Sequence, residues 1–214
     1  MVTPPHPDPA SSDRSQPDYV FDFCGGQLAI DFTNTVGSRG DEPTEHLNTL
    51  GDLVAWAEAR GVIGRPEAAT LRRDAAAAPD RARRAFRDVI DLREALYAIF
   101  KAIADEKRPR PADVERVNRA VAETYAAATL APAAGRRFVL ETGADGGLTR
   151  ITAPVVRAAV ELLTSDQVLQ IGRCADETCG WVFLDTTRSH TRRWCDMKSC
   201  GNRSKVRRFR GTGS

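Results

Sequence analysis

The sequence predicts a mainly α-helical protein with a small β element (α+β), followed by a short C-terminal module held together by a metal. Apolar residues recur at spacings of three and four in several segments between 49 and 170, which is the period of amphipathic helices. Four of the five cysteines fall in two close pairs between 174 and 200. We therefore expect three parts: a disordered leader at 1–18, a mainly helical regulatory or sensor domain at 19–168, and a four-cysteine finger with a basic C-terminal helix at 170–214.

The N-terminal segment changes character after residue 18. Residues 1–18 contain five prolines and few apolar side chains, so they cannot bury enough surface to fold. Apolar residues alternate from Tyr19, the pattern breaks at Gly25-Gly26, and it resumes to Phe32. This predicts a strand and a turn that lead into a short strand or the start of a helix.

Capping residues, glycine and proline indicate where the next helices begin and end. Thr49 and Asp52 stand at the cap and third positions before an apolar run that Gly61 closes. Pro66 opens another helix, because proline is favoured at the first helical position. The clearest helix carries one apolar face and ends before Pro109. That face consists of Phe86, Val89, Ile90, Leu96, Ile99, Phe100 and Ile103.

Three further elements complete the expected body. Pro111 starts a helix whose apolar face holds Val114, Val117, Val121 and Tyr125. Residues 137–141 and 148–152 flank a Gly/Asp-rich turn and are predicted to form a hairpin. A last helix is expected from Pro154 to about Gln170.

Composition and charge limit the function classes. Apolar residues make up 42% and charged residues 28%, which is typical of a globular protein. No run approaches the roughly 18 apolar residues of a membrane span, and no secretory signal is evident, so we expect a cytoplasmic protein without a membrane partner. Residues 171–214 hold ten Lys/Arg against four Asp/Glu, whereas the other residues hold 21 against 25. A basic tail on a mildly acidic body favours a polyanionic partner.

The paired cysteines predict one structural zinc ion. Their pattern is C-x4-C, fifteen residues, C-x4-C, and thiols remain reduced in the cytoplasm. Four thiolates suit tetrahedral Zn²⁺ and leave no position open for water. Gly180 and Gly201 each follow a pair, where a missing Cβ would let backbone N–H groups approach the sulfur. The expected ligands are Cys174, Cys179, Cys195 and Cys200.

Flanking residues complete the predicted layout of the module. Residues 180–184 have strand character and residues 199–210 can form a basic helix, which together resemble a treble clef. The alternative is a set of four buried or oxidised cysteines, but a segment this short has too little core to fold without a staple or docking. Cys24 is expected to be a packed small hydrophobe. His190 is either an exposed loop residue or a substitute ligand.

These motifs resemble a known family. The run Cys-x4-Cys-Gly-Trp-x-Phe-x-Asp and the later Cys200-Gly201-Asn202-Arg203 are similar to the bacterial CGNR zinc finger over residues 170–212. Residues 25–36 resemble the opening motif of the domain that accompanies this finger. The resemblance implies a zinc-binding regulator of transcription that responds to stress.

The basic helix is the candidate nucleic-acid interface. Arginine forks suit phosphate and guanine, so we expect double-stranded DNA as the partner. The alternative is a solvated tail or a basic face that pairs with the acidic body. Within the finger, Asn202 is expected to form a hydrogen bond with the backbone, and Arg203 to pair with Asp185 or Asp196. Val206 and Phe209 are expected to face the module. The candidate DNA contacts are Arg188, Arg192, Arg193, Lys198, Arg203, Lys205, Arg207, Arg208 and Arg210.

The body offers weaker signals. Asp31 and Asn34 could line a pocket for a small-molecule effector, although we favour their capping the neighbouring turn, and the body could also form a homodimer. No acid–base pair, phosphate loop or nucleophile motif is present in the sequence, so we expect no enzyme activity. A nuclease would need an open metal site, which four thiolates close. The remaining alternative is a zinc-stapled protein-interaction module that docks through Trp181, Phe183 and Trp194.

Overall fold

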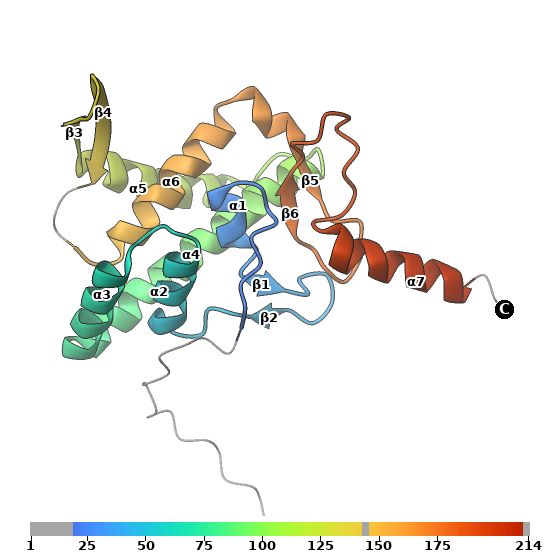
Figure 1. Cartoon of the computed structure of the whole chain (residues 1–214), viewed down its shortest axis with the longest axis horizontal. Coiled ribbons are helices and arrows are strands. Elements are labelled where there is room, and N and C mark those ends of the chain that lie inside the picture. Colours follow the sequence, from blue (N-terminus) through green and yellow to red (C-terminus); the bar gives the residue numbers. More distant parts are fainter. Residues whose placement is uncertain (1–18, 143–145, 212–214) are drawn as a thin grey trace, which may run out of the picture.

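The computed structural model describes residues 19–142 and 146–211, so the expected leader lies outside the described residues. A short helix, α1 (Leu28–Thr33), lies at the centre and packs against α4 (Pro79–Ala104) and α6 (Thr149–Leu163) (Figure 1). Ile30 and Phe32 are buried there. The strand expected before α1 does not form: no described strand pairs with this segment, and Phe21 and Phe23 instead pack on the core from an irregular chain.

The next two helices begin where the sequence predicts. α2 (Leu50–Ala59) starts with a reciprocal cap, in which the Asp52 amide donates to Thr49 Oγ1 at 3.2 Å and the Thr49 amide donates to Asp52 Oδ2 at 2.8 Å. Gly61, with φ of 75°, follows its end. α3 (Arg65–Ala77) has Pro66 in its first turn.

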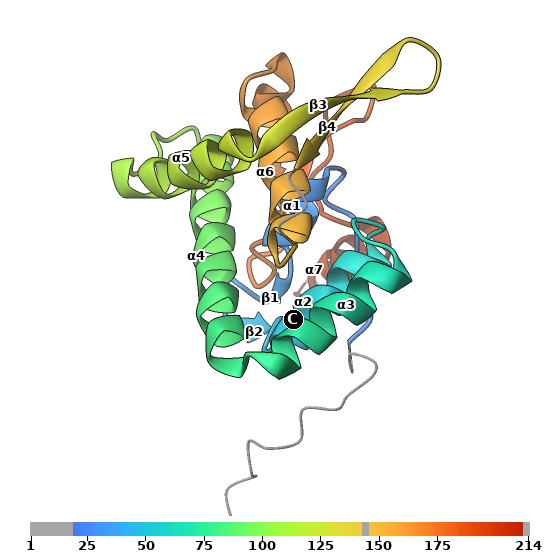
Figure 2. The same cartoon turned by 90° about the vertical axis from the view of Figure 1, so that its left-hand side faces the viewer.

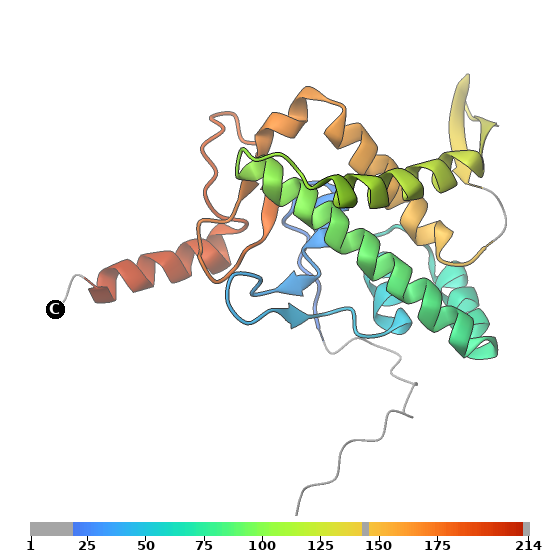
Figure 3. The ribbon, with the colours of Figure 1, turned by 180° about the vertical axis from the view of Figure 1, so that it is seen from behind.

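The long helix α4 crosses the back of the molecule (Figure 3). Its predicted apolar face is confirmed at Leu96 and Phe100, which are fully buried. The same face also buries Arg93, which is 1% exposed. The Arg93 guanidinium donates to both carboxylate oxygens of Glu45, at 2.7 and 2.6 Å, so a partly buried ion pair ties α4 to the edge of β2 (Thr44–Glu45).

The predicted hairpin is wrong in its position: it forms earlier in the chain than expected. α5 (Pro111–Ala126) leads directly into β3 (Ala128–Ala133), which pairs with β4 (Arg137–Thr142), and this ribbon projects from the body (Figure 2). Gly135 and Arg136 both have positive φ, so the reversal occurs there and not at the later Gly/Asp-rich stretch. On α5 itself Val117 is buried, whereas Val114 and Tyr125 are exposed.

The expected second hairpin strand is the start of α6. This helix begins five residues before Pro154, because Ile151 joins Val155 and Ala159 on one buried helical face. It ends at Leu163 and is followed by a 3₁₀ turn, η1 (Asp166–Gln170), so the expected helix is split. The helical character of this region is confirmed and its start is corrected.

Short sheets complete the described structure, each with two antiparallel strands. β1 (Val36–Gly37) pairs with β2, and β5 (Ile171–Arg173) pairs with β6 (Val182–Leu184). A π-helical turn, η2 (Met197–Gly201), leads into α7 (Asn202–Gly211). The fold is therefore mainly α with a small β component. Across the described ranges, no helix combines the length and apolar character needed to cross a bilayer.

Candidate metal centre

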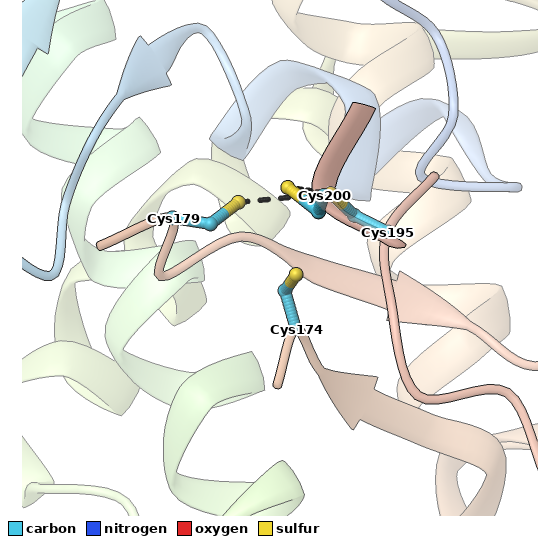
Figure 4. A group of neighbouring side chains, drawn as sticks. All are labelled: Cys174, Cys179, Cys195 and Cys200. Carbon is cyan, nitrogen blue, oxygen red and sulfur yellow. Dashed lines mark hydrogen bonds between the residues drawn. The ribbon is translucent and has the colours of Figure 1, made fainter. Parts of the chain in front are cut away.

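Four separate pieces of backbone bring the paired cysteines together (Figure 4). Cys174 follows β5, Cys179 lies in the turn before β6, Cys195 ends the long loop after β6, and Cys200 lies within η2. All four are buried. The arrangement places one ligand, Cys200, immediately before α7, so any ion bound here fixes the start of that helix.

The geometry of the sulfurs fits one tetrahedral ion. The four Sγ atoms all lie within 4.8 Å of one another. Cys179 Sγ is 3.6 Å from Cys195 Sγ, which is 3.5 Å from Cys200 Sγ. Tetrahedral zinc with Zn–S bonds of about 2.3 Å requires sulfurs about 3.8 Å apart. The predicted ligand set therefore lies within about 1 Å of the sulfur spacing that zinc requires.

The electrostatics of this cluster also favour a cation. Contacts from the Cys179 and Cys195 thiols lower the pKa of Cys174, while the Cys174 and Cys179 thiols and burial raise the pKa of Cys195. Burial and the nearby Cys174 also raise the pKa of Cys200. Ionising all four thiols together is costly because thiolates this close repel one another. A divalent cation removes that repulsion, so the site suits an ion that binds four thiolates.

Asp176 and Arg203 connect the cluster to α7. The Arg203 guanidinium donates from Nη2 to Cys200 Sγ at 2.9 Å and from Nε to Asp176 Oδ2 at 3.1 Å. Arg207 donates to Asp176 Oδ1 at 2.8 Å, and Thr178 donates to the same oxygen. Burial alone would raise the pKa of Asp176, but hydrogen bonds from Arg207 and Thr178 lower it. The expected pairing of Arg203 with Asp185 or Asp196 is thus wrong, because Asp176 is its partner.

The remaining polar residues of the module serve its loops. Asn202 donates to the Lys198 carbonyl at 3.0 Å, as expected for a backbone role. Asp196 accepts from the Ser199 amide at 2.7 Å and caps η2. His190 is exposed, its Nδ1 lies 3.3 Å from the Asp185 carbonyl, and it is not in the cysteine cluster.

The two glycines have a different role from the expected one. Gly180 has φ of 67°, and a Cβ there would lie 2.8 Å from Arg39 Cβ. A Cβ on Gly201 would lie 2.8 Å from Met197 Sδ. Close packing against the backbone of residues 39–40 and its positive φ therefore require glycine at position 180, whereas a Cβ at position 201 would displace only the flexible Met197 side chain.

A loop of the body supports the cysteine turn. The amide of Arg39 donates to the Cys179 carbonyl at 3.0 Å, and that of Gly40 donates to the Thr178 carbonyl at 3.2 Å. The Arg39 guanidinium stacks 3.9 Å from the Tyr97 ring centroid. Sequence reasoning missed these residues, because the polar loop at 37–43 carries no motif and its contacts arise only in the fold.

The two predicted pocket residues form hydrogen bonds within the chain, and those of Asn34 join the body to the module. Asn34 is 2% exposed; its Nδ2 donates to the Val182 carbonyl at 2.8 Å and its Oδ1 accepts from the Val182 amide at 3.3 Å. Asp31 is 1% exposed and accepts from the Gly25 amide at 2.9 Å and from Arg60 Nε at 2.8 Å. Asp31 thus caps the turn at Gly25, as the sequence favoured, whereas the expected capping of the turn by Asn34 is wrong, because Asn34 bonds β6.

The core of the body continues into the module. Ile171, Val182 and Leu184 belong to the same apolar cluster as the helices, and α4 contacts both β5 and β6. Trp181 Nε1 donates to the Val36 carbonyl at 2.7 Å. The module is thus docked on the body over one continuous core.

Two family comparisons agree with this architecture. Residues 26–166 match ABATE, described as "Putative stress-induced transcription regulator", and this region is about two-thirds of the chain. Residues 170–211 match the CGNR zinc finger. The chain belongs to the ABATE family. A search of curated proteins found no match to it. The four close cysteines within the CGNR finger form the site of one structural zinc ion.

The predicted cations of the CGNR finger differ in their surroundings. Arg203 and Arg207 pair with Asp176 while their side chains stay 57% and 52% exposed. The side chains of Arg208 and Arg210 lie outside the described part of α7. Lys205 on α7 is exposed, as are Arg188, Arg193 and Lys198 in the segments before this helix.

Arg192 holds the finger's backbone together. Its guanidinium stacks 4.4 Å from the Phe183 ring centroid and donates to carbonyls from three segments of the chain. Because these hydrogen bonds occupy most of its N–H donors, the Arg192 guanidinium has no free pair of donors for a phosphate. The prediction that Arg192 contacts DNA is therefore not kept. The four acceptors are the carbonyls of Cys24, Leu184, Trp194 and Cys195.

The apolar residues of α7 do not face the finger. Val206 is 49% and Phe209 83% exposed, which corrects the expected orientation. The helix is rotated so that Arg203 and Arg207 face Asp176, because their ion pairs satisfy a carboxylate whose side chain is fully buried. This pairing, four residues apart on α7, sets the helix face.

Proposed function

We propose that this ABATE protein regulates transcription by binding double-stranded DNA through α7, with zinc fixing the start of that helix. The observation that carries the proposal is the placement of α7. It extends away from the body in opposite views (Figures 1 and 3), while Cys200 and Asp176 hold its first two turns. An ordered, protruding helix can enter a DNA groove without first folding.

The charge of this helix supports the same partner. Residues 202–211 contain five basic residues and no acidic residue. Lys198 and Lys205 are exposed next to the zinc turn and on the helix, and Arg188 and Arg193 are exposed in the loop before it. A phosphate backbone carries the complementary charge, so these residues are the proposed backbone contacts.

Arg203 and Arg207 have two tasks in this proposal. Each donates a hydrogen bond to the buried Asp176, and this pairing orients the helix. Arginine has five N–H donors, so the exposed part of each fork can still reach a phosphate or a guanine. The two residues would therefore be pre-ordered contacts, whose binding costs little side-chain entropy.

Zinc has a structural role in this proposal, and the protein is not an enzyme. Four thiolates fill the tetrahedral positions, which leaves no site where the metal could activate water. The ABATE body would then serve as the sensor or dimerisation part, responding to a small-molecule effector or to a second copy. DNA binding would place the protein in the bacterial cytoplasm.

In the alternative, a protein-interaction module, most of the aromatic residues expected to contact a partner are buried within the chain. Trp181 is 8% and Phe183 1% exposed, since both pack within the chain. Trp194 packs against the cysteine cluster, and the Arg193 guanidinium lies over its ring at 5.2 Å. These aromatic residues are used to build the finger, so they are not a free surface for a partner.

A pair of charge variants in the full chain tests the DNA proposal. Lys205→Gln removes one cation from α7, and Arg84→Gln removes one from the start of α4, at the opposite end of the molecule (Figure 1). Binding of zinc-loaded protein to mixed genomic duplex is measured by fluorescence anisotropy. We expect Lys205→Gln to weaken binding about three- to tenfold and Arg84→Gln to leave it unchanged. Equal effects of the two variants, or no binding by the wild type, would refute the proposal.

A further inference from the structure

A fifth thiol lies against the zinc ligands, although it belongs to the body. Cys24 precedes α1 and packs on the cluster formed by the four cysteines, Trp181 and Phe183. Arg192 holds it there: Nη2 of this one side chain donates to the Cys24 carbonyl at 2.8 Å and also to the Cys195 carbonyl. The sequence places these cysteines 171 positions apart, and the fold brings them together.

An open groove gives solvent access to this pair. It has a volume of about 450 Å³ and is lined by both Cys24 and Cys195, together with the loop at 187–197. Cys24 is partly exposed, whereas Cys195 is 1% exposed. A small solute in the groove therefore has better access to Cys24 than to Cys195.

We propose that Cys24 is an oxidation site for hydroperoxides, and that its oxidation forms a disulfide with Cys195 and releases zinc. The groove admits the oxidant, Cys24 reacts first, and Cys195 is the only zinc ligand that shares the groove with it.

The reaction has two balanced steps. The Cys24 sulfur attacks the distal oxygen of the hydroperoxide, the O–O bond breaks, and the alcohol, or water from hydrogen peroxide, leaves with the thiol proton, giving a sulfenic acid. The Cys195 thiolate then attacks the Cys24 sulfur; the S–S bond forms, the S–O bond breaks and hydroxide leaves. The two thiols together lose two electrons, which the peroxide gains.

Loss of one thiolate changes the finger as a whole. Three thiolates remain, and a structural site of this kind depends on four. Cys200 is then no longer tied to Cys195 through the ion, so the start of α7 loses one of its two anchors and keeps only the ion pairs with Asp176. This last consequence rests on the proposed DNA binding, whereas the disulfide and the zinc release do not.

The test follows zinc and thiols in the full chain. Zinc-loaded wild type and Cys24→Ser are treated with hydrogen peroxide, released zinc is followed with a chromogenic chelator, and disulfides are mapped by mass spectrometry after alkylation. We expect one zinc equivalent from the wild type with a Cys24–Cys195 disulfide, and roughly tenfold slower release from Cys24→Ser. Thiol reductant and added zinc should restore the starting state.

Controls separate the possible failures. Ser189→Ala changes the same groove without a thiol and should behave as the wild type. If Cys24→Ser binds less than one zinc, Cys24→Ala replaces it, and the disulfide map of the wild type needs no variant. Equal release rates from wild type and a zinc-loaded Cys24 variant, or oxidised wild type in which Cys24 is still alkylated, would overturn the proposal. DNA binding is measured on the same samples. If only the proposed function is wrong, the protein does not bind DNA but still forms the disulfide and releases zinc.

Discussion

Replacing Asn34 with alanine should uncouple the body from the zinc finger at one defined point. The side chain makes two hydrogen bonds to Val182, one to its carbonyl and one to its amide, and all of these atoms lie in the buried joint between α1 and β6. Alanine leaves both backbone groups of Val182 without this partner while they remain buried.

The size of the effect follows from those two groups. A buried donor or acceptor that loses its partner costs about 1–3 kcal/mol, so two neighbouring groups with some relaxation cost about 2–4 kcal/mol. In a chain of this length each kcal/mol lowers Tm by about 2–4 °C. The full-length, zinc-saturated Asn34→Ala protein should therefore unfold at clearly lower urea concentration and temperature than the wild type.

The assay is urea unfolding followed by circular dichroism at saturating zinc. Asn118→Ala is the matched control, because Asn118 is exposed on α5, and the same substitution there should change the free energy of unfolding by less than about 0.5 kcal/mol. If Asn34→Ala is as stable as this control, the joint does not bear on stability and the reasoning fails. A role for Asn34 in effector binding alone would give that result.

Two further substitutions test other parts of the structure. Gly40→Ala should lower the free energy of unfolding in urea by about 2–3 kcal/mol, because its Cβ would lie 1.8 Å from the Glu177 carbonyl oxygen. The control Gly51→Ala, within α2, should be neutral or stabilising. Equal effects of the two substitutions would contradict the docking of the loop that holds Gly40. Burial would raise the pKa of Glu45, but hydrogen bonds from Arg93 hold it below its ordinary value of 4.5. This pairing stabilises the fold above pH 4.5 and is lost as pH falls through the lowered pKa, so Glu45→Gln should be less stable than wild type near neutral pH by about 1–2 kcal/mol, with a gap that shrinks in acid. A gap independent of pH would show that the charge of Glu45 is not the cause.

Local signals were sufficient to predict most helices and the metal ligands. The Thr49–Asp52 cap and the apolar period of α4 depend only on near neighbours in sequence, and both appear as expected. The four cysteines could be identified because zinc ligation restricts residue type and spacing at once. Asp176 could have been suspected as a charged residue inside the first pair, but no spacing rule connects it with α7.

The errors arose where distant contacts decide the structure. The turn at Gly135-Arg136 competes with a stronger glycine cluster ten residues later, and the burial of Ile151 in α6 settles the competition. The rotation of α7 follows from Asp176 rather than from the apolar residues of the helix itself. The position of Cys24 beside Cys195 depends on how the body docks on the finger, which no local pattern encodes.

The central claim is that zinc turns α7 into an ordered cationic DNA-binding element. A salt titration of duplex binding by the full chain, with metal content measured on each sample, tests it most directly. Six exposed or half-exposed cations are candidates for phosphate contact: Arg188, Arg193, Lys198, Arg203, Lys205 and Arg207. The account predicts a log–log slope of about −5 for protein with one zinc equivalent, and much weaker binding after chelation. Binding that does not depend on salt, or that keeps its strength when the zinc is gone, would contradict it.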